Sequence, residues 1–182
     1  MTYSQKGNQK AFYECTGALD IDSTKIDVRS NKLYFQFNVE DSPKNLKDFV
    51  WLKDKPKEYF TGYLVNTSDS TFSANIQDGS LIIIQEALDK DGNWNPIEYW
   101  VYSGCGNSYF SLKLDTGKYV MIPIKKYSGK FKTKIRLKFK YGADVLYSES
   151  FEGSLNVSQF EKETEDVNGI LYHGPANYLN KE

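Results

Sequence analysis

Cationic and mostly apolar residues alternate without a break across residues 130–141. The even positions are all cations: Lys130, Lys132, Lys134, Arg136, Lys138 and Lys140. The odd positions are aromatic, aliphatic or threonine. A period of two predicts a strand with one face in a core and the other in water. We expect its apolar face, which includes Ile135 and Phe139, to lie in the core opposite a hairpin over residues 81–103.

Short runs of this kind, separated by turn residues, recur along the chain and predict a mostly-β protein with an antiparallel β-sandwich. The expected strands cover residues 31–39, 59–66, 71–76, 81–88, 94–103, 109–114, 118–126, 130–141 and 145–151. Pro123 cannot donate to a sheet ladder, so its strand is expected to be an edge or to carry a bulge there. Ser42 followed by Pro43 predicts one short helix near 43–52.

The 81–103 hairpin is apolar on both faces of its strands. One face would carry Ile82, Ile84, Leu88, Trp94, Trp100 and Tyr102, and the other Leu81, Ile83, Ile97, Tyr99 and Val101. Strands of this type are covered on both sides. We expect the N-terminal segment or the 43–52 helix to cover the second face.

The turn after Tyr141 sets the register of the next strand. A two-residue turn would place Tyr147 and Phe151 beside the lysines. A three-residue turn would place Val145, Tyr147 and Phe151 beside the apolar face of 130–141, and burial favours this second register. In the same register Glu152 falls near Lys134.

We expect three segments: an N-terminal extension with short strands at 1–30, the β-sandwich at 31–157 and an extended polar C-terminal tail at 158–182. The tail contains a charged run over 161–166 without apolar spacing. Its candidate docking residues are Ile170, Leu171, Tyr178 and Leu179.

Composition and charge narrow the function classes. Of the 182 residues, 40% are hydrophobic and 15% aromatic, which is enough for a sizeable core. The 23 basic residues balance 24 acidic ones, so a dedicated nucleic-acid binder is not expected. No apolar run is long enough for a membrane span. The polar start predicts a cytoplasmic protein, or an extracytoplasmic one if a leader has been removed.

Catalytic and metal-binding patterns are weak. His173, the single histidine, lies in the tail, where it makes a poor base for a nucleophile. Glu86 and Glu98 lie on adjacent expected strands and are the candidate carboxylate pair of a hydrolase. No phosphate loop or cofactor motif is present, so we expect no cofactor. No metal site is expected either.

The nearest approach to a metal site is a loop with Asp89, Asp91 and Asn93, which resembles the front half of a calcium loop and also suits an ordinary hairpin turn. Cys15 and Cys105 could form one disulfide or remain two thiols, and the sequence leaves both open.

Two candidate binding surfaces remain. Cations on one strand face, Lys132, Lys134, Arg136 and Lys138, would suit a polyanion, or would be balanced by acids on neighbouring strands. Three aromatic residues, Trp94, Trp100 and Tyr102, would suit a glycan or protein partner, or would fill the core.

The strand that ends in Asn66-Thr67-Ser68-Asp69-Ser70, with the later Gly117-Lys118-Tyr119 and Gly129-Lys130-Phe131, resembles bacterial immunoglobulin-like and fibronectin-III-like sandwich modules over residues 58–155. The resemblance implies a non-catalytic binding, spacer or inhibitory module and assigns no functional residue. We therefore expect an interaction module with a protein or glycan partner. The alternatives are an inhibitor or immunity-type protein that blocks an enzyme through loop 89–93 or 104–108, and a carboxylate-dependent hydrolase.

Overall fold

The computed structural model describes residues 7–39, 49, 52, 55–162 and 175–179. These residues are mostly β, and the helical segments with defined bounds among them are short 3₁₀ turns. The turns are η2 (Pro56–Glu58), η3 (Gly106–Ser108), η4 (Val157–Phe160) and η5 (Pro175–Tyr178). The predicted 43–52 helix lies outside the described residues, apart from the buried side chains of Phe49 and Leu52. The described residues include no helix with the length and apolar character needed to span a bilayer.

One sheet has four strands in the order β2 (Leu19–Asp20), β11 (Lys118–Lys125), β4 (Tyr59–Asn66) and β3 (Leu33–Asn38). Pro123 pairs with Thr61 of β4, whereas β2 pairs only with Lys118 and Tyr119 at the other end of β11. Pro123 therefore lies where β11 is an edge strand, as its missing N–H requires.

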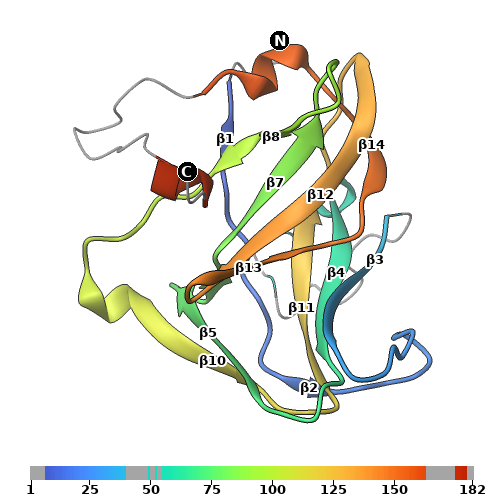
Figure 1. Cartoon of the computed structure of the whole chain (residues 1–182), viewed down its shortest axis with the longest axis vertical. Helices are drawn as coiled ribbons and strands as arrows, with labels where there is room; N and C mark the ends of the chain where they lie inside the picture. Colours follow the sequence, from blue (N-terminus) through green and yellow to red (C-terminus); the bar gives the residue numbers. More distant parts are fainter. Residues whose placement is uncertain (1–6, 40–48, 50–51, 53–54, 163–174, 180–182) are drawn as a thin grey trace.

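The longest strand, β12 (Phe131–Tyr141), organises a five-stranded sheet (Figure 1). Its neighbours are β7 (Ile83–Leu88) on one side and β13 (Asp144–Tyr147) and β14 (Phe151–Leu155) on the other, and β8 (Trp94–Pro96) pairs with β7. The alternation that predicted β12 is confirmed. The expectation that β12 packs face to face on the 81–103 hairpin is wrong. β12 is instead hydrogen-bonded to β7 of that hairpin within one sheet.

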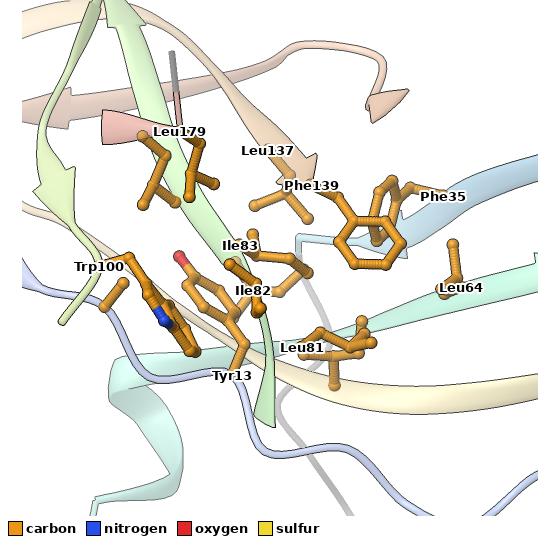
Figure 2. Packing of buried hydrophobic residues seen from close by; sticks show 14 of the residues in the cluster. Tyr13, Phe35, Leu64, Leu81, Ile82, Ile83, Trp100, Leu137, Phe139 and Leu179 are labelled. Carbon is orange, nitrogen blue, oxygen red and sulfur yellow. The ribbon is translucent and has the colours of Figure 1, made fainter. Parts of the chain in front are cut away.

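The apolar face of β12 packs against the four-stranded sheet instead. The ring of Phe139 meets Phe35 of β3 edge to face, with centroids 6.0 Å apart. Phe151 of β14 does the same with Phe37 of β3 and Phe60 of β4, at 5.1 Å each. Figure 2 shows Phe35, Leu64 and Leu81 gathered around Phe139. Aromatic and aliphatic side chains from both sheets thus share one core.

The register after β12 corrects the predicted turn. Tyr141 pairs with Asp144, so the turn has two residues, and Gly142 supplies the positive φ (58°) that such a turn needs. The pairing then shifts by one residue between β13 and β14, because Lys138 pairs with Tyr147 whereas Ile135 pairs with Phe151. Tyr147 therefore lies on the cationic face, and only Phe151 joins the apolar face as expected.

Two smaller sheets complete the fold. One has the order β10 (Tyr109–Leu114), β5 (Phe72–Gln77) and β6 (Ser80–Leu81). The other pairs β1 (Gln9–Lys10) in parallel with β9 (Glu98–Tyr99).

Both ends of the described chain pack against the hairpin region. Tyr13 is fully buried, and its carbonyl accepts a hydrogen bond from the Leu81 N–H. Tyr178 and Leu179 are buried in the same core, and the Trp100 N–H donates to the Asn177 carbonyl. Figure 2 shows Tyr13, Trp100 and Leu179, which all belong to this core. The N-terminal segment thus pairs along the edge of the hairpin region, the predicted cover of its second face stays a prediction, and Tyr178 and Leu179 dock as anticipated.

Candidate functional site

The cationic face of β12 is internal at one end. Glu86 of β7 accepts hydrogen bonds from Arg136 Nε at 3.0 Å and Nη2 at 2.7 Å, and lies 3.0 Å from Lys138 Nζ. Glu86 and Lys138 are each only 4% exposed. The Arg136 guanidinium lies between the rings of Trp94 and Tyr147, 4.2 and 4.0 Å from their centroids. Arg136 and Lys138, two predicted binding residues, are therefore committed to this internal cluster.

The other end of the same face is open. Lys130, Lys132 and Lys134 are exposed, and they form no ion pair with any described residue. Lys134 pairs in register with Glu152, as expected. Of the four cations predicted to bind, Lys132 and Lys134 therefore remain available to a partner.

The predicted aromatic surface does not form. Trp100 is 3% exposed in the main core, and its indole N–H donates to Gln77 Oε1. Tyr102 packs half-buried against the same core. Trp94 instead stacks on Arg136 at the end of β8. The three side chains therefore fill or border the interior, which is the alternative use of such residues.

The acidic loop after β7 is a turn that is stabilised by hydrogen bonds to the carboxylate of Asp89. Asp89 Oδ1 accepts from the N–H groups of Asp91 and Asn93, and Oδ2 accepts from Asn95 Nδ2. The backbone N–H of Asn93, which has the largest effect, and that of Asp91 lower the pKa of Asp89. No group of three or more histidine, cysteine, aspartate or glutamate side chains suited to a metal occurs in the described part of the chain.

Glu86 and Glu98 do not form a carboxylate pair. Glu98 accepts from the backbone N–H of Gln85 and lies 3.4 Å from Gln85 Nε2, so the Gln85 side chain points toward it. Glu86 is the next residue on β7 and points to the opposite face, toward Arg136 and Lys138. Each carboxylate is buried with its own partners, which contradicts the pairing on which the hydrolase hypothesis rests.

A pocket of about 380 Å³ opens beside the exposed lysines. It is lined by Val39, Phe60, Lys126, Tyr127, Lys132, Ile135, Phe151, Glu152, Gly153 and Ser154, and we call it the lysine-rimmed pocket. Phe60 and Ile135 are buried, and Phe151 stands edge to face on Phe60. The pocket thus joins apolar groups to two lysines and one glutamate, a combination typical of ligand sites.

Tyr127, one of the lining residues, is hydrogen-bonded to a buried carboxyl. Glu98, 2% exposed, accepts from Tyr127 at 2.6 Å, Tyr13 at 2.5 Å and the Gln85 N–H at 2.7 Å. Burial raises the pKa of Glu98, and the hydrogen bonds from these three residues oppose the shift. Burial and the neighbouring Glu98 raise the pKa of Tyr127 far above its usual range. Tyr127 therefore keeps its proton, directs it inward, and offers a ligand only a neutral acceptor.

Glu98 predicts a pH dependence of stability. The pKa of Glu98 is higher in the folded chain than in the unfolded chain. Glu98 therefore makes its full contribution to the free energy of unfolding below about pH 4.3, and this contribution is lost as the pH rises through the folded-state pKa. We expect the difference in unfolding free energy, wild type minus Glu98→Gln, to fall from about pH 4 to about pH 8. Chemical denaturation across this range measures it, with the exposed Glu152→Gln as control. A difference that stays flat or rises would contradict the raised pKa.

Both cysteines are free thiols. Cys15 Sγ lies 3.4 Å from the Gly79 carbonyl, and burial raises the pKa of the Cys15 thiol to about 11. Cys105 is exposed in the loop before β10. The disulfide alternative is therefore not adopted.

Sequence reasoning anticipated one residue of the pocket as a binding residue, Lys132. Phe60 lies on β4, Tyr127 lies in the connection that follows β11, and Phe151 lies on β14. No local sequence pattern links these three segments. The sequence predicts only a catalytic role for Glu98, because its two tyrosine partners lie 85 and 29 residues away. Comparisons with protein-family models, with curated proteins and with solved structures find no match for this chain.

Proposed function

We propose that this protein is a non-catalytic binding module that recognises a partner protein through the lysine-rimmed pocket. The observation that carries the proposal is the pocket itself, which places a half-buried Phe151 and a buried Phe60 beside Lys126 and Lys132. Protein interfaces commonly centre on an apolar anchor in a pocket, surrounded by a polar rim.

The surroundings of the pocket favour binding over catalysis. Tyr127 holds its proton in a hydrogen bond to Glu98, so it is a poor acid or nucleophile for a ligand. Glu86, the other half of the anticipated carboxylate pair, belongs to the cluster with Arg136 and Lys138. The lining residues thus supply shape and charge rather than an activated group.

A protein partner fits this surface better than a glycan. Sugars stack on exposed flat rings, whereas Trp100 is buried and Trp94 is covered by Arg136. For the scaffold we propose an antiparallel, immunoglobulin-like β-sandwich. The packing of Phe139 and Phe151 against the sheet that contains β3 and β4 supports this architecture.

The proposal is tested with charge reversal at the rim. We expect the double variant Lys126→Glu/Lys132→Glu to lose most of a partner protein that the wild type captures from source-cell lysate. Lys90→Glu/Lys113→Glu carries the same charge change at exposed positions outside the pocket and should retain it. Circular dichroism checks that both variants fold.

Equal recovery of the partner by the pocket variant and the wild type would exclude the pocket as the recognition site. If the captured protein is an enzyme whose activity falls on binding, the module acts as an inhibitor. If the pocket variant retains the partner and a variant of loop 104–108 loses it, the recognition site is that loop and not the pocket.

A further inference from the structure

We propose that the lysine-rimmed pocket receives one large apolar side chain of the partner together with a carboxylate next to it. This inference rests on the proposed function and specifies its ligand chemistry. A carboxylate next to an apolar side chain has two protein sources: the free C-terminus of a chain that ends in an apolar residue, or an Asp or Glu side chain beside such a residue.

The interior of the pocket selects the apolar part. Phe60 and Ile135 line the pocket but are each 1% exposed, so they form a floor that the core holds in place. Phe151 is only half-buried, and its ring stands at 77° to that of Phe60. A further aromatic or aliphatic group can pack on such a ring without rearranging the core. A volume of about 380 Å³ is near the small end of ligand pockets, which suits one side chain rather than a long apolar segment.

The charged residues at the opening of the pocket favour an anionic group on the ligand. Lys126 and Lys132 line the opening against one glutamate, Glu152, and neither lysine has an ion-pair partner among the described residues. Lys130 and Lys134 continue the cationic face of β12 next to Lys132. An anion is therefore favoured at this edge of the pocket.

Lysine chemistry and Tyr127 favour a carboxylate as the anion. A lysine ammonium is a mobile point charge, whereas bidentate phosphate recognition favours arginine. The one arginine of this face, Arg136, is held by Glu86 and two aromatic rings. Tyr127 donates to Glu98, so the lysines are the charged donors of the lining.

Three small probes test the ligand chemistry with the full chain. N-acetyl-phenylalanine carries a free terminal carboxylate, N-acetyl-glutamyl-phenylalanine amide carries a side-chain carboxylate, and N-acetyl-phenylalanine amide carries none. Titrations followed by the backbone amide signals of Gly153 and Ser154 report occupancy of the pocket. We expect at least one carboxylate probe to bind about fivefold more tightly than the uncharged amide, with the advantage shrinking at high salt.

The variant Lys132→Gln should remove most of that advantage, measured as the ratio of the affinities for the carboxylate probe and the uncharged amide. The matched variant Lys113→Gln, at an exposed position of β10, should leave this ratio unchanged. Preference for the first or the second carboxylate probe identifies a chain terminus or an internal acidic residue as the source.

Equal binding of charged and uncharged probes would overturn the carboxylate assignment, as would failure of all three probes to shift the signals of Gly153 and Ser154. In either case capture of the partner by the wild type, and its loss from Lys126→Glu/Lys132→Glu, would still support the proposed function. If Lys126→Glu/Lys132→Glu captures as much of the partner as the wild type does, the proposed function is rejected, whatever the probes show.

Discussion

Replacing Glu86 with alanine is expected to lower the free energy of unfolding by about 3–5 kcal/mol, because removal of one partner leaves buried charge uncompensated. Lys138 Nζ would retain its contact with the Tyr178 carbonyl but lose its carboxylate, and Arg136 would lose two hydrogen bonds. Urea denaturation with a constant m-value is the appropriate measurement.

Two comparisons make this expectation specific to the buried cluster. Lys138→Met should cost less than Glu86→Ala, because Glu86 would still be held by Arg136 and no cation would remain uncompensated. Lys134→Ala, on the exposed end of the same strand, should stay within about 0.5 kcal/mol of the wild type. Equal costs for Glu86→Ala and Lys134→Ala would mean that Glu86 does not neutralise a buried charge.

Replacing Gly129 with alanine is expected to destabilise the fold by about 3 kcal/mol. An added Cβ at this position would lie 2.1 Å from the carbonyl carbon of Leu155 and 2.4 Å from the Asn156 nitrogen. Both atoms are backbone, so relief requires the start of β12 and the end of β14 to separate. That movement would also displace Lys132 and Ser154 at the pocket.

Gly104→Ala is the matched control for this substitution. Its added Cβ would meet no atom within 4 Å, so its effect should stay within about 0.5 kcal/mol. Thermal denaturation compares the two variants, and the amide signals of Gly153 and Ser154 report the pocket. A stable Gly129→Ala protein with unshifted signals would contradict the close approach of the two strands.

The sequence was most informative where one physical rule decides the outcome. Period-two alternation placed a strand over 130–141, and the structure has β12 at Phe131–Tyr141. Pro123 was expected at an edge because it lacks a donor, and it pairs on one side only. These features depend on the residues of a single segment.

Features that depend on distant partners could not be read from one segment. Arg136 and Lys138 look equivalent to Lys132 and Lys134 in the alternating pattern, yet the first two are neutralised by Glu86, 50 residues from Arg136. The one-residue shift between Tyr147 and Phe151 likewise reverses the face on which Tyr147 lies. The pocket was missed for the same reason, since its walls meet only after β4, β12 and β14 are assembled.

The stretch around β9 is completed by segments from both ends of the described chain, which has a consequence for its folding. Gln9 and Ala11 donate to the carbonyls of Ile97 and Tyr99, and Trp100 donates to the carbonyl of Asn177. One short stretch in the middle of the chain thus needs partners from both ends of the described sequence. During synthesis Trp100 emerges long before residues 177–179, so its side of the core remains open to water until they arrive. Contacts this distant in sequence form slowly, and an exposed tryptophan surface of this kind is a target for chaperones.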